Sequence, residues 1–409
     1  MPKKLLTRTP RPSARQDILK TAQNLKMARS AHAYVRGSTL RFYNWLNETR
    51  ASSLPEGPAI WICGDCHIGN LGPVANAEGK IDIQIRDFDQ TVIGNPSHDL
   101  IRLALSLAMA ARSSDLPGVI TAKMMEVLVE GYESAFRPGD DLRLGKKPQS
   151  VRVALKTAHR RTWKELAHER MQGKTVHIPL GKRFWSASRQ ERKEITALVE
   201  SAPARALLTA SLRHREDDAA IKMLDTAYWM KGCSSLGLLR FAVLLDVNKQ
   251  ASESSDLCLF DIKEAVTAAA PRYRDAGMPR DNAERVVTGA RHLAPHLGSR
   301  MLATRLLERP VFVRELLPQD LKLEIDHVSQ EEALRAARYL ARVVGQAHAR
   351  QMDEATCRAW HTELARQRSK TLEVPSWLWR SVVDLVANHE RAYLEHCRRY
   401  ALGEQAVEF

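Results

Sequence analysis

Strand-like patterns are concentrated in one stretch of this chain, and helical patterns lie on both sides of it. Apolar runs at 238–247 (LLRFAVLLDV) and 257–262 (LCLFDI) are joined by a polar connector, and a third strand pattern follows at 311–316. Apolar residues recur three or four positions apart in 16–47, and another helical pattern covers 97–112. Because strand and helix patterns are segregated along the chain, the sequence predicts an α+β fold.

The chain has 409 residues, which is more than one hydrophobic core usually organises, so we predict two lobes. A mostly helical lobe would comprise residues 1–225 and 326–409, and a small β-rich lobe residues 226–325. Within the first part, residues 119–228 have a mostly helical pattern. No apolar run reaches the roughly 18 residues that cross a bilayer, and the basic N-terminus lacks the apolar segment of a signal peptide. We therefore expect a cytoplasmic protein without a membrane span.

Two helix starts carry capping-box patterns, in which a serine is followed three residues later by glutamate. They are Ser188 with Glu191, and Ser329 with Glu332. The second opens a long helix that places His348 on its apolar face. A buried histidine with satisfied hydrogen bonds is the favoured interpretation of His348.

The densest polar motifs, GDCHIGN and DFDQT, each follow a short strand pattern near the N-terminus. The first motif carries Asp65 and Asn70, and the second begins with Asp87 at the end of a strand that can form a hairpin. Phosphoryl transfer from ATP needs one carboxylate that orients the attacking hydroxyl, and amide and carboxylate oxygens that hold Mg²⁺. Asp65, Asn70 and Asp87 have this chemistry, and Asp89 is a further metal ligand or a turn residue.

The spacing Asp65-x-x-x-x-Asn70 resembles the catalytic loop of protein kinases and aminoglycoside phosphotransferases, and Asp87-Phe88-Asp89 resembles the metal-binding segment of the phosphotransferases. The segments AYVRG, CGDCHIGN, RDFDQT and IKEA are similar to those of the DUF2252 family of bacterial proteins. This resemblance covers most of the chain. It implies a kinase-like fold, ATP and Mg²⁺, a catalytic role for Asp65, and metal binding by Asn70, Asp87 and Asp89.

The other half of a kinase-like site is expected in the β-rich part. A glycine-rich loop lets backbone N–H groups approach phosphate, and the nucleotide-binding loop expected here is formed by Gly232, Ser234, Ser235 and Gly237, with serine where kinases have their middle glycine. Lys263, at the end of the next strand, would contact the α- and β-phosphates and pair with a helix carboxylate, for which Glu284 is the candidate. The segment 311–317, which includes Glu315, would receive the adenine.

These motifs occur in an order that is inverted relative to kinases, in which the glycine loop and lysine precede the catalytic loop. The segment GQAHAR, residues 345–350, resembles the end of the helix before a kinase catalytic loop, yet it lies near the C-terminus. We therefore predict a circular permutation, which domains tolerate because their termini often lie close together at the surface.

Several residues have open alternatives. Cys63-x-x-Cys66-His67 also fits a haem attachment pattern or part of a zinc site. Arg36 and His67 are candidates for substrate binding, and for Arg36 an ion pair within the fold is the alternative. Asp99 is expected to cap a helix or to brace the catalytic loop.

The formal net charge is +14, and much of it is concentrated between Arg143 and Lys193, where 15 lysines and arginines stand against 3 acidic residues. Such a segment attracts anionic partners, or it is a solvated face. The sequence therefore favours an ATP- and Mg²⁺-dependent phosphotransferase that acts on an unidentified hydroxyl acceptor. The alternatives are a catalytically inactive, nucleotide-sensing binding protein and a nucleic-acid-binding protein that uses the segment 143–193.

Overall fold

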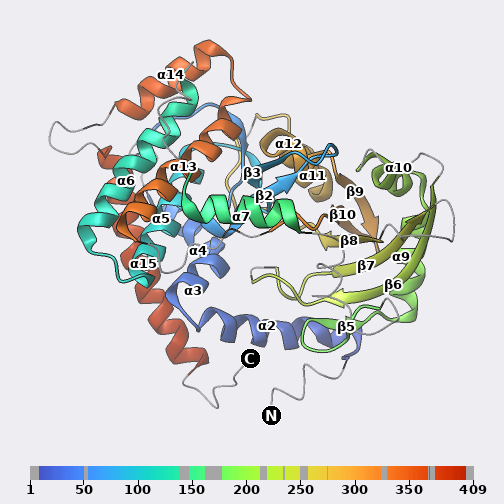
Figure 1. Ribbon diagram of the computed structural model, residues 1–409. Helices are drawn as coiled ribbons and strands as arrows, with labels where there is room; N and C mark the ends of the chain where they lie inside the picture. The colour runs from blue at the N-terminus through green and yellow to red at the C-terminus, as the bar shows by residue number, and fades with distance from the viewer. Residues whose placement is uncertain are drawn as a thin grey trace.

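The structure is a computed structural model with a mixed α+β fold (Figure 1). It describes residues 9–49, 54–137, 147–161, 177–211, 219–233, 235–248, 257–273, 275–321, 323, 329–366, 368 and 374–401. Figure 1 shows most long helices on one side of the molecule, a large sheet on the other, and the hairpin of β2 and β3 between them. This arrangement places the two predicted halves of the site next to each other.

The large sheet is antiparallel and has six strands in the order β5-β6-β7-β8-β10-β9. Its strands are β5 (Phe184–Ser186), β6 (Ala220–Trp229), β7 (Arg240–Asn248), β8 (Leu257–Glu264), β9 (Met301–Leu306) and β10 (Arg309–Leu316). Side chains alternate between the two faces of a strand. On β8, Phe260 and Ile262 therefore pack on one face against α9 (Arg189–Glu200) and α10 (Ala202–Ala210), while Asp261 and Lys263 lie on the opposite face.

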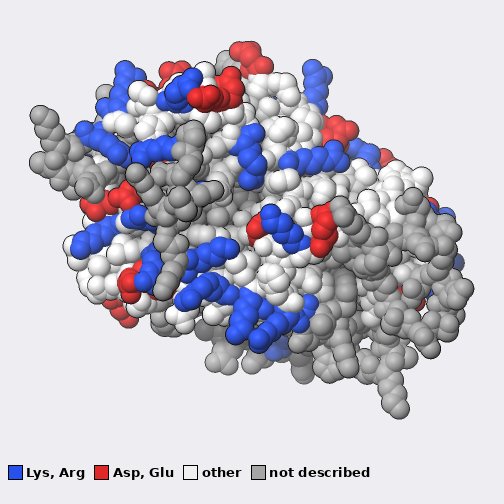
Figure 2. Space-filling view, turned by 45° about the horizontal axis from the view of Figure 1, so that its top comes forward, with Lys and Arg blue, Asp and Glu red and all other residues white. Residues whose placement is uncertain are grey.

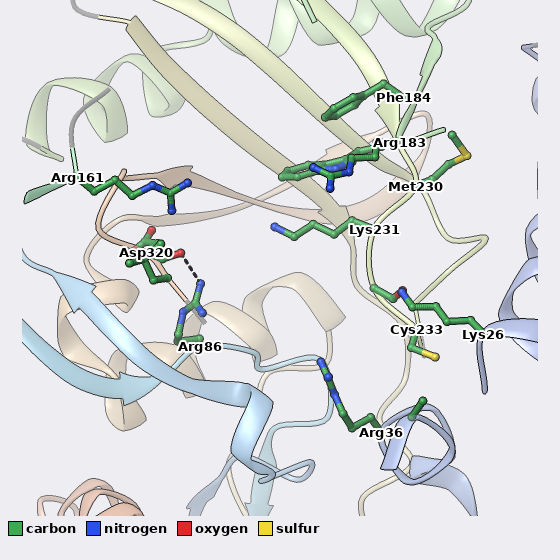
Figure 3. Close-up of a pocket in the computed structure, with 14 residues that line it drawn as sticks. Lys26, Arg36, Arg86, Arg161, Arg183, Phe184, Met230, Lys231, Cys233 and Asp320 are labelled. Carbon is green, nitrogen blue, oxygen red and sulfur yellow. Dashed lines mark hydrogen bonds between the residues drawn. The ribbon is translucent and has the colours of Figure 1, made fainter. Parts of the chain in front are cut away.

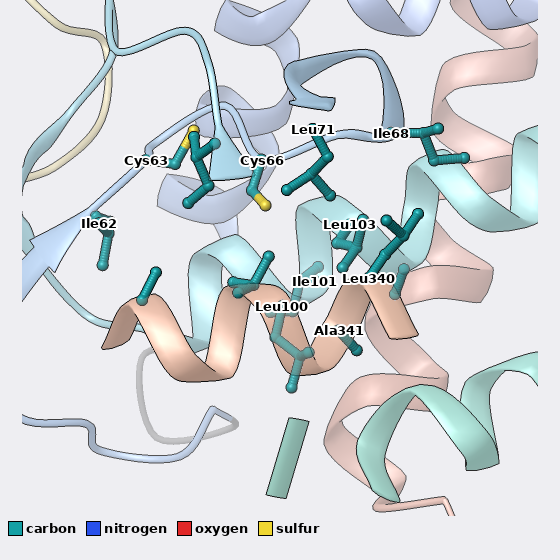
Figure 4. Packing of buried hydrophobic residues seen from close by; sticks show 14 of the residues in the cluster. Ile62, Cys63, Cys66, Ile68, Leu71, Leu100, Ile101, Leu103, Leu340 and Ala341 are labelled. Atoms are coloured by element: carbon teal, nitrogen blue, oxygen red, sulfur yellow. The ribbon is translucent and has the colours of Figure 1, made fainter. Parts of the chain in front are cut away.

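The helical side has its own hydrophobic core. Its helices are α3 (Ala31–Gly37), α4 (Thr39–Glu48), α5 (Ser97–Ser113), α6 (Gly118–Glu133), α7 (Gln149–Arg160), α13 (Gln330–Ala349), α14 (Glu354–Ala365) and α15 (Ser376–Tyr400), with short 3₁₀ turns η1 (Pro12–Ala14), η3 (Ile68–Asn70) and η4 (Ser134–Phe136). In Figure 4, Leu100 and Leu103 of α5 and Leu340 of α13 pack beneath the loop that carries Cys63 and Cys66. The predicted catalytic loop therefore rests on a rigid, fully buried layer.

Two small sheets join the polar motifs to this core. β1 (Ile60–Ile62) pairs with β4 (Val92–Gly94), and β2 (Leu71–Ala75) forms an antiparallel hairpin with β3 (Ile81–Ile85). The hairpin turn is closed by Asn76, whose side chain accepts hydrogen bonds from the backbone N–H groups of Glu78 (3.1 Å) and Lys80 (2.8 Å).

Several sequence predictions are confirmed. Strands form at each predicted run, and the helix α5 lies where it was expected. Glu284 lies on a helix as expected, α11 (Asn282–Leu293), which is followed by the short α12 (Pro295–Gly298). Ser188 and Glu191 form a complete capping box, and Ser329 caps α13 by accepting a hydrogen bond from the N–H group of Glu332.

Other predictions need correction. The mostly helical pattern predicted for 119–228 is wrong in two places, because β5 and β6 belong to the large sheet. β6 has an irregular register between Met223 and Asp225, and this β-bulge breaks the alternation that identifies a strand. The predicted lobe boundary at residue 226 falls inside β6.

The helical stretch predicted at 16–47 is divided into α2 (Arg15–Met27), α3 and α4. The division occurs because Ser30 caps α3 by accepting a hydrogen bond from the N–H group of Ala33, which starts a new helix. Among the described residues, no helix has the length and apolarity needed to cross a bilayer.

Candidate functional site

The loop after β1 is held in place by a tight glycine turn and by the Asp99 side chain. Gly64 has a φ of +76°, and a Cβ atom there would lie 2.1 Å from the carbonyl oxygen of Gln90, so only glycine fits. The carboxylate of Asp99, at the start of α5, accepts hydrogen bonds from the N–H groups of Cys63 (2.7 Å) and Gly64 (2.9 Å). Asp99 thus braces the predicted catalytic loop, which was one of its two expected roles.

Asp99 is itself supported by a buried chain of hydrogen bonds. The indole of Trp360 donates to the Tyr132 hydroxyl (3.2 Å), which lies 2.8 Å from Nδ1 of His348. Nε2 of His348 lies 3.2 Å from the Asp99 carboxylate. One assignment of protons satisfies every step: Tyr132 donates to Nδ1, and the Nε2–H group of His348 donates to Asp99. His348 is therefore the satisfied core histidine that was expected.

Asp65 is nearly buried, and both of its carboxylate oxygens are engaged. Oδ1 accepts a hydrogen bond from Nε of Arg102 (2.9 Å), and Oδ2 accepts one from the Thr39 hydroxyl (2.9 Å). Nε2 of His67 lies 3.9 Å from Oδ2, and burial lowers the pKa of His67 to about 4, so this ring is neutral at neutral pH. These contacts fix the orientation of the Asp65 carboxylate.

Asn70 and Asp87 meet at the open end of the hairpin. Asn70 directly precedes β2, Asp87 follows β3 by two residues, and the N–H group of Arg86 donates to the Asn70 carbonyl (2.8 Å). The Asn70 amide nitrogen donates to the backbone carbonyl of Asp65 (2.9 Å). The three polar residues of the two motifs are therefore adjacent, as the hairpin prediction required.

Lys263 joins the large sheet to this hairpin. Its side chain is 4% exposed, and its Nζ atom lies 3.3 Å from Oδ1 of Asp87 and also contacts Oδ2 of Asp89. A lysine on β8 thus meets two carboxylates that lie more than 170 positions away in the sequence.

The two carboxylates that share Lys263 have different electrostatic environments. Burial raises the pKa of Asp87, but the cations Lys263, Arg314 and Arg240 outweigh this effect and hold the pKa below its ordinary value. Burial also raises the pKa of Asp89, and the neighbouring Asp87 charge raises it further, to about 6. Asp87 is therefore the carboxylate that stays ionised, and Asp89 titrates close to neutral pH.

The glycine-rich loop between β6 and β7 lies over the same region. Gly232 and Gly237 have φ values of +98° and +102°, a backbone region that favours glycine. The loop is held from below by α2: Nζ of Lys26 donates to the Gly232 carbonyl (2.6 Å), and the Gln23 amide donates to the Cys233 carbonyl (2.8 Å). Ser234, which we predicted to contact the nucleotide, lies outside the described residues.

A pocket of about 100 Å³ lies between the hairpin, the catalytic loop and the glycine-rich loop. It is lined by Arg36, Asp65, His67, Gly69, Asn70, Arg86, Asp87, Lys231, Gly232, Cys233, Ser235, Arg240 and Arg314. The structure thus brings seven of the predicted site residues to one pocket, including Arg36 and His67, whereas Asp89, Lys263 and Gly237 do not line it. Arg36 has no hydrogen-bond or ion-pair partner among the described residues, so the ion pair considered as its alternative does not form there.

Two further predicted residues, Glu284 and Glu315, also lie outside the pocket. Glu284 is exposed at the start of α11 and does not pair with Lys263, whose amine contacts Asp87 and Asp89 instead. The next residue, Arg285, faces inward and donates to the backbone carbonyl of Asp89 (3.1 Å). Glu315 is fully buried within β10, opposite Phe260 of β8, and does not line the small pocket.

Three basic residues of the site were not predicted from the sequence. Arg240 and Arg314 both donate to the fully buried carboxylate of Asp261, and together they form a buried triad with one excess positive charge beside Lys263. Arg102 is fully buried on α5. Arg102 could have been identified, because it is an arginine within an otherwise apolar helical run. A buried arginine needs a partner, so this pattern indicates a nearby acid.

A family model with the description "Uncharacterized protein conserved in bacteria (DUF2252)" matches residues 15–399. The chain belongs to the DUF2252 family. No curated protein and no solved structure gives a match. The DUF2252 match contains every residue that we predicted for the site.

The Cys-x-x-Cys-His motif of this DUF2252 chain lies mostly in the core. Cys63 and Cys66 are buried among the residues drawn in Figure 4, and neither lines the small pocket. The hydrogen bond to Cys66, together with burial, raises the pKa of the Cys63 thiol. Within the described ranges, no three His, Cys, Asp or Glu side chains are grouped so that they could hold a metal ion. A kinase-type Mg²⁺ site differs from such a cluster, because it uses few protein oxygens together with phosphate and water.

Proposed function

We propose that this chain is an ATP-dependent phosphotransferase with a kinase-like, two-lobed and circularly permuted architecture. Residues 226–325 would be the core of the nucleotide lobe, and the helical lobe would be built from residues 1–225 and 326–409. The acceptor is a hydroxyl compound. Asp65 would orient its hydroxyl, and Lys263 and the glycine-rich loop would bind the phosphates of ATP.

The observation that carries the proposal is the contact of Lys263 with Asp87, at 3.3 Å. A phosphoryl-transfer site needs a lysine for the phosphates and a carboxylate for the metal ion, on opposite sides of one triphosphate. This pair has that chemistry. Asp65, Asn70 and Asp87 line the same small pocket, and Lys263 adjoins it through its contact with Asp87.

The proposed circular permutation is supported by a contact between two segments that are far apart in the sequence. The side-chain amide of Gln351, just after α13, accepts a hydrogen bond from the N–H group of Trp61 (2.9 Å) and donates one to the Trp61 carbonyl (3.0 Å). The end of α13 therefore lies beside β1, the strand that leads into the Asp65 loop. In a kinase these two elements are consecutive, which is the relation that a circular permutation preserves.

Asn70 and Asp87, which line the pocket, and Asp89, which does not, fit a Mg²⁺ ion, because this ion prefers hard oxygen ligands and retains several waters. The Asp87 side chain is 43% exposed, and Oδ1 of Asp89 is buried with no hydrogen-bond partner among the residues that the structure describes. The Asn70 amide nitrogen is engaged by the Asp65 carbonyl, so its oxygen is the atom left for a ligand. When bound, the ion would neutralise phosphate charge, and Asn70, Asp87 and Asp89 would hold it.

The reaction balances with ATP and a hydroxyl compound alone. The acceptor oxygen attacks the γ-phosphorus, and the bond from that phosphorus to the β–γ bridging oxygen breaks. ADP leaves with the electron pair, and the hydroxyl proton passes to Asp65 or to solvent. Asp65 suits this role, because Thr39 and Arg102 fix its carboxylate and each oxygen retains a further lone pair.

A second candidate function, nucleic-acid binding, draws on the basic segment 143–193. Within its described part, Arg152, Lys156 and Arg160 are exposed at four-residue intervals along α7. Figure 2 shows Lys and Arg side chains gathered in the lower middle of one face, with few acidic side chains among them. A steep salt dependence of DNA or RNA binding that is lost when these three residues are neutralised would favour this function.

The experiment that tests the proposed function is Mg²⁺-dependent ATP binding and turnover by the full chain. We expect Asp87→Asn and Lys263→Met to reduce turnover by about 100-fold or more, because each removes a charge that is needed at the transferring phosphate. Asp82→Asn is the matched control, since Asp82 is half-exposed on the same hairpin and outside the pocket. Equal turnover in all four proteins would refute the site. Mg²⁺-dependent ATP binding without turnover would instead favour the inactive, nucleotide-sensing alternative.

A further inference from the structure

A second, larger pocket adjoins the small one. It has a volume of about 650 Å³, and it shares Arg36, Arg86 and Lys231 with the small pocket (Figure 3). Figure 3 shows these side chains entering the pocket from three directions: Arg36 from α3, Arg86 from the hairpin, and Lys231 from the glycine-rich loop. A molecule in the large pocket therefore has a direct route to Asp65 and Asp87.

The lining of the large pocket is strongly basic. Its charged residues are Lys26, Arg36, Arg86, Arg161, Arg183, Lys231 and Asp320. Asp320, the single acid among the described lining residues, is already engaged, because Nη2 of the buried Arg300 donates to its carboxylate at 3.2 Å. Arg36 and Arg183 have no side-chain partner among the described residues. Cations gathered in one pocket repel each other unless an anion lies between them.

The pocket is less suited to an uncharged aromatic group. Its two aromatic residues, Phe184 and Trp229, are 3% and 4% exposed and stack on each other with ring centroids 5.6 Å apart. The Lys231 amine lies 4.1 Å from the Trp229 ring centroid. Since these rings are buried and already in contact, they offer little surface on which a base could stack. The pocket can therefore recognise a ligand mainly through the positive charge of its basic side chains.

We infer that the large pocket binds a small molecule that carries several phosphate groups, and that this molecule is the phosphoryl acceptor. The second half of the inference rests on the proposed function. Arginine is suited to this task, because its planar guanidinium binds phosphate oxygens in pairs. A volume of about 650 Å³ suits a compact ligand of this kind. A free hydroxyl of the acceptor would reach Asp65 through the small pocket and attack the γ-phosphorus, with ADP leaving as described above.

The test measures binding of inositol hexakisphosphate, as a polyphosphate probe, to the full chain by calorimetry in EDTA. The pocket variant is Arg36→Gln with Arg183→Gln. The control, Lys80→Gln with Arg358→Gln, removes the same charge at exposed positions outside the pocket. We expect the pocket variant to bind at least about tenfold more weakly, because it loses charge-assisted hydrogen bonds. The control should change binding by less than about twofold, because exposed charges are screened.

A second arm repeats the titration in the presence of saturating Mg²⁺ and ATP. We expect the probe still to bind, because Arg36 and Arg183 of the large pocket would hold its phosphates, whereas Lys263, which lines neither pocket, would hold those of ATP. Displacement of the probe by ATP would overturn the inference, as would no binding or equal weakening in both double variants. Failure here leaves the proposed function intact if ATP binding is retained and still depends on Asp87. Conversely, probe binding without any ATP binding would refute the acceptor role and the proposed function together.

Discussion

The substitution Asp99→Asn tests how the candidate catalytic loop is held. Asp99 is fully buried. Its Oδ2 accepts a hydrogen bond from the N–H group of Cys63 and lies 3.2 Å from Nε2 of His348, and its Oδ1 accepts one from the N–H group of Gly64. Asparagine has one acceptor oxygen, so its amide nitrogen must face one of these donors. The variant loses at least one charge-assisted hydrogen bond and leaves a buried donor without a partner, which costs about 2–4 kcal/mol.

This cost is measurable in two ways. For a chain of this length it corresponds to a fall of roughly 2–5 °C in Tm, and urea unfolding followed by tryptophan fluorescence gives the free energy directly. We also expect ATP turnover to fall by more than the loss of folded protein explains, because the loop positions Asp65. Asp82→Asn is the control and should remain within about 0.5 kcal/mol of the wild type. The same small change in Asp99→Asn would refute the claim that Asp99 braces the loop.

Three further predictions concern stability. Gly64→Ala should destabilise the fold by about 3 kcal/mol or more in urea unfolding, because its Cβ would lie 2.1 Å from the Gln90 carbonyl oxygen. Gly79→Ala, at a φ of +77° with no atom within 4 Å, should cost only about 1 kcal/mol, and equal losses at the two positions would contradict the steric argument. Burial lowers the pKa of His389 to about 3, so the unfolded chain binds a proton first and stability should fall as the pH drops from about 6.5 to 3. In His389→Leu, the free energy of unfolding should depend on pH less steeply across this range, by up to about 1.4 kcal/mol per pH unit. An unchanged slope would contradict the role assigned to His389. Ser188→Ala removes a helix cap and should cost about 1 kcal/mol by the same assay, whereas no measurable loss would show that the cap contributes little.

The parts of the site that depend on local pattern could be predicted from the sequence. The alternation in 80–86 and the turn before it predict a hairpin, and a hairpin brings Asn70 and Asp87 together whatever the rest of the chain does. Likewise, a lysine at the end of a strand in the β-rich segment was identifiable as a phosphate-binding candidate, and Lys263 does meet Asp87.

The parts that depend on the rotation of a helix or on an irregular strand could not be predicted. The helix α11 was predicted correctly, but successive residues on a helix point about 100° apart, and the inward position belongs to Arg285 rather than Glu284. Likewise, the bulge in β6 shifts its register between Met223 and Asp225, so a search for strict alternation misses a strand of the large sheet.

Gln351 and Trp61 are 290 positions apart in the sequence but lie side by side in the structure. The two hydrogen bonds between the Gln351 amide and the Trp61 backbone are of the kind that a neighbouring strand would supply, and they dock the end of α13 against β1 without a peptide bond between them. The chemistry of a phosphotransferase requires a lysine, two metal-binding side chains and an orienting carboxylate at one triphosphate, and it sets no condition on which of them comes first in the chain. Under the proposed function, the site can therefore be intact although its motifs occur in inverted order. Non-covalent contacts such as those of Gln351 then hold α13 against β1, which a kinase links through the chain itself. A sequence comparison that demands the kinase order would overlook such a chain, whereas the contact of Lys263 with Asp87 does not depend on that order.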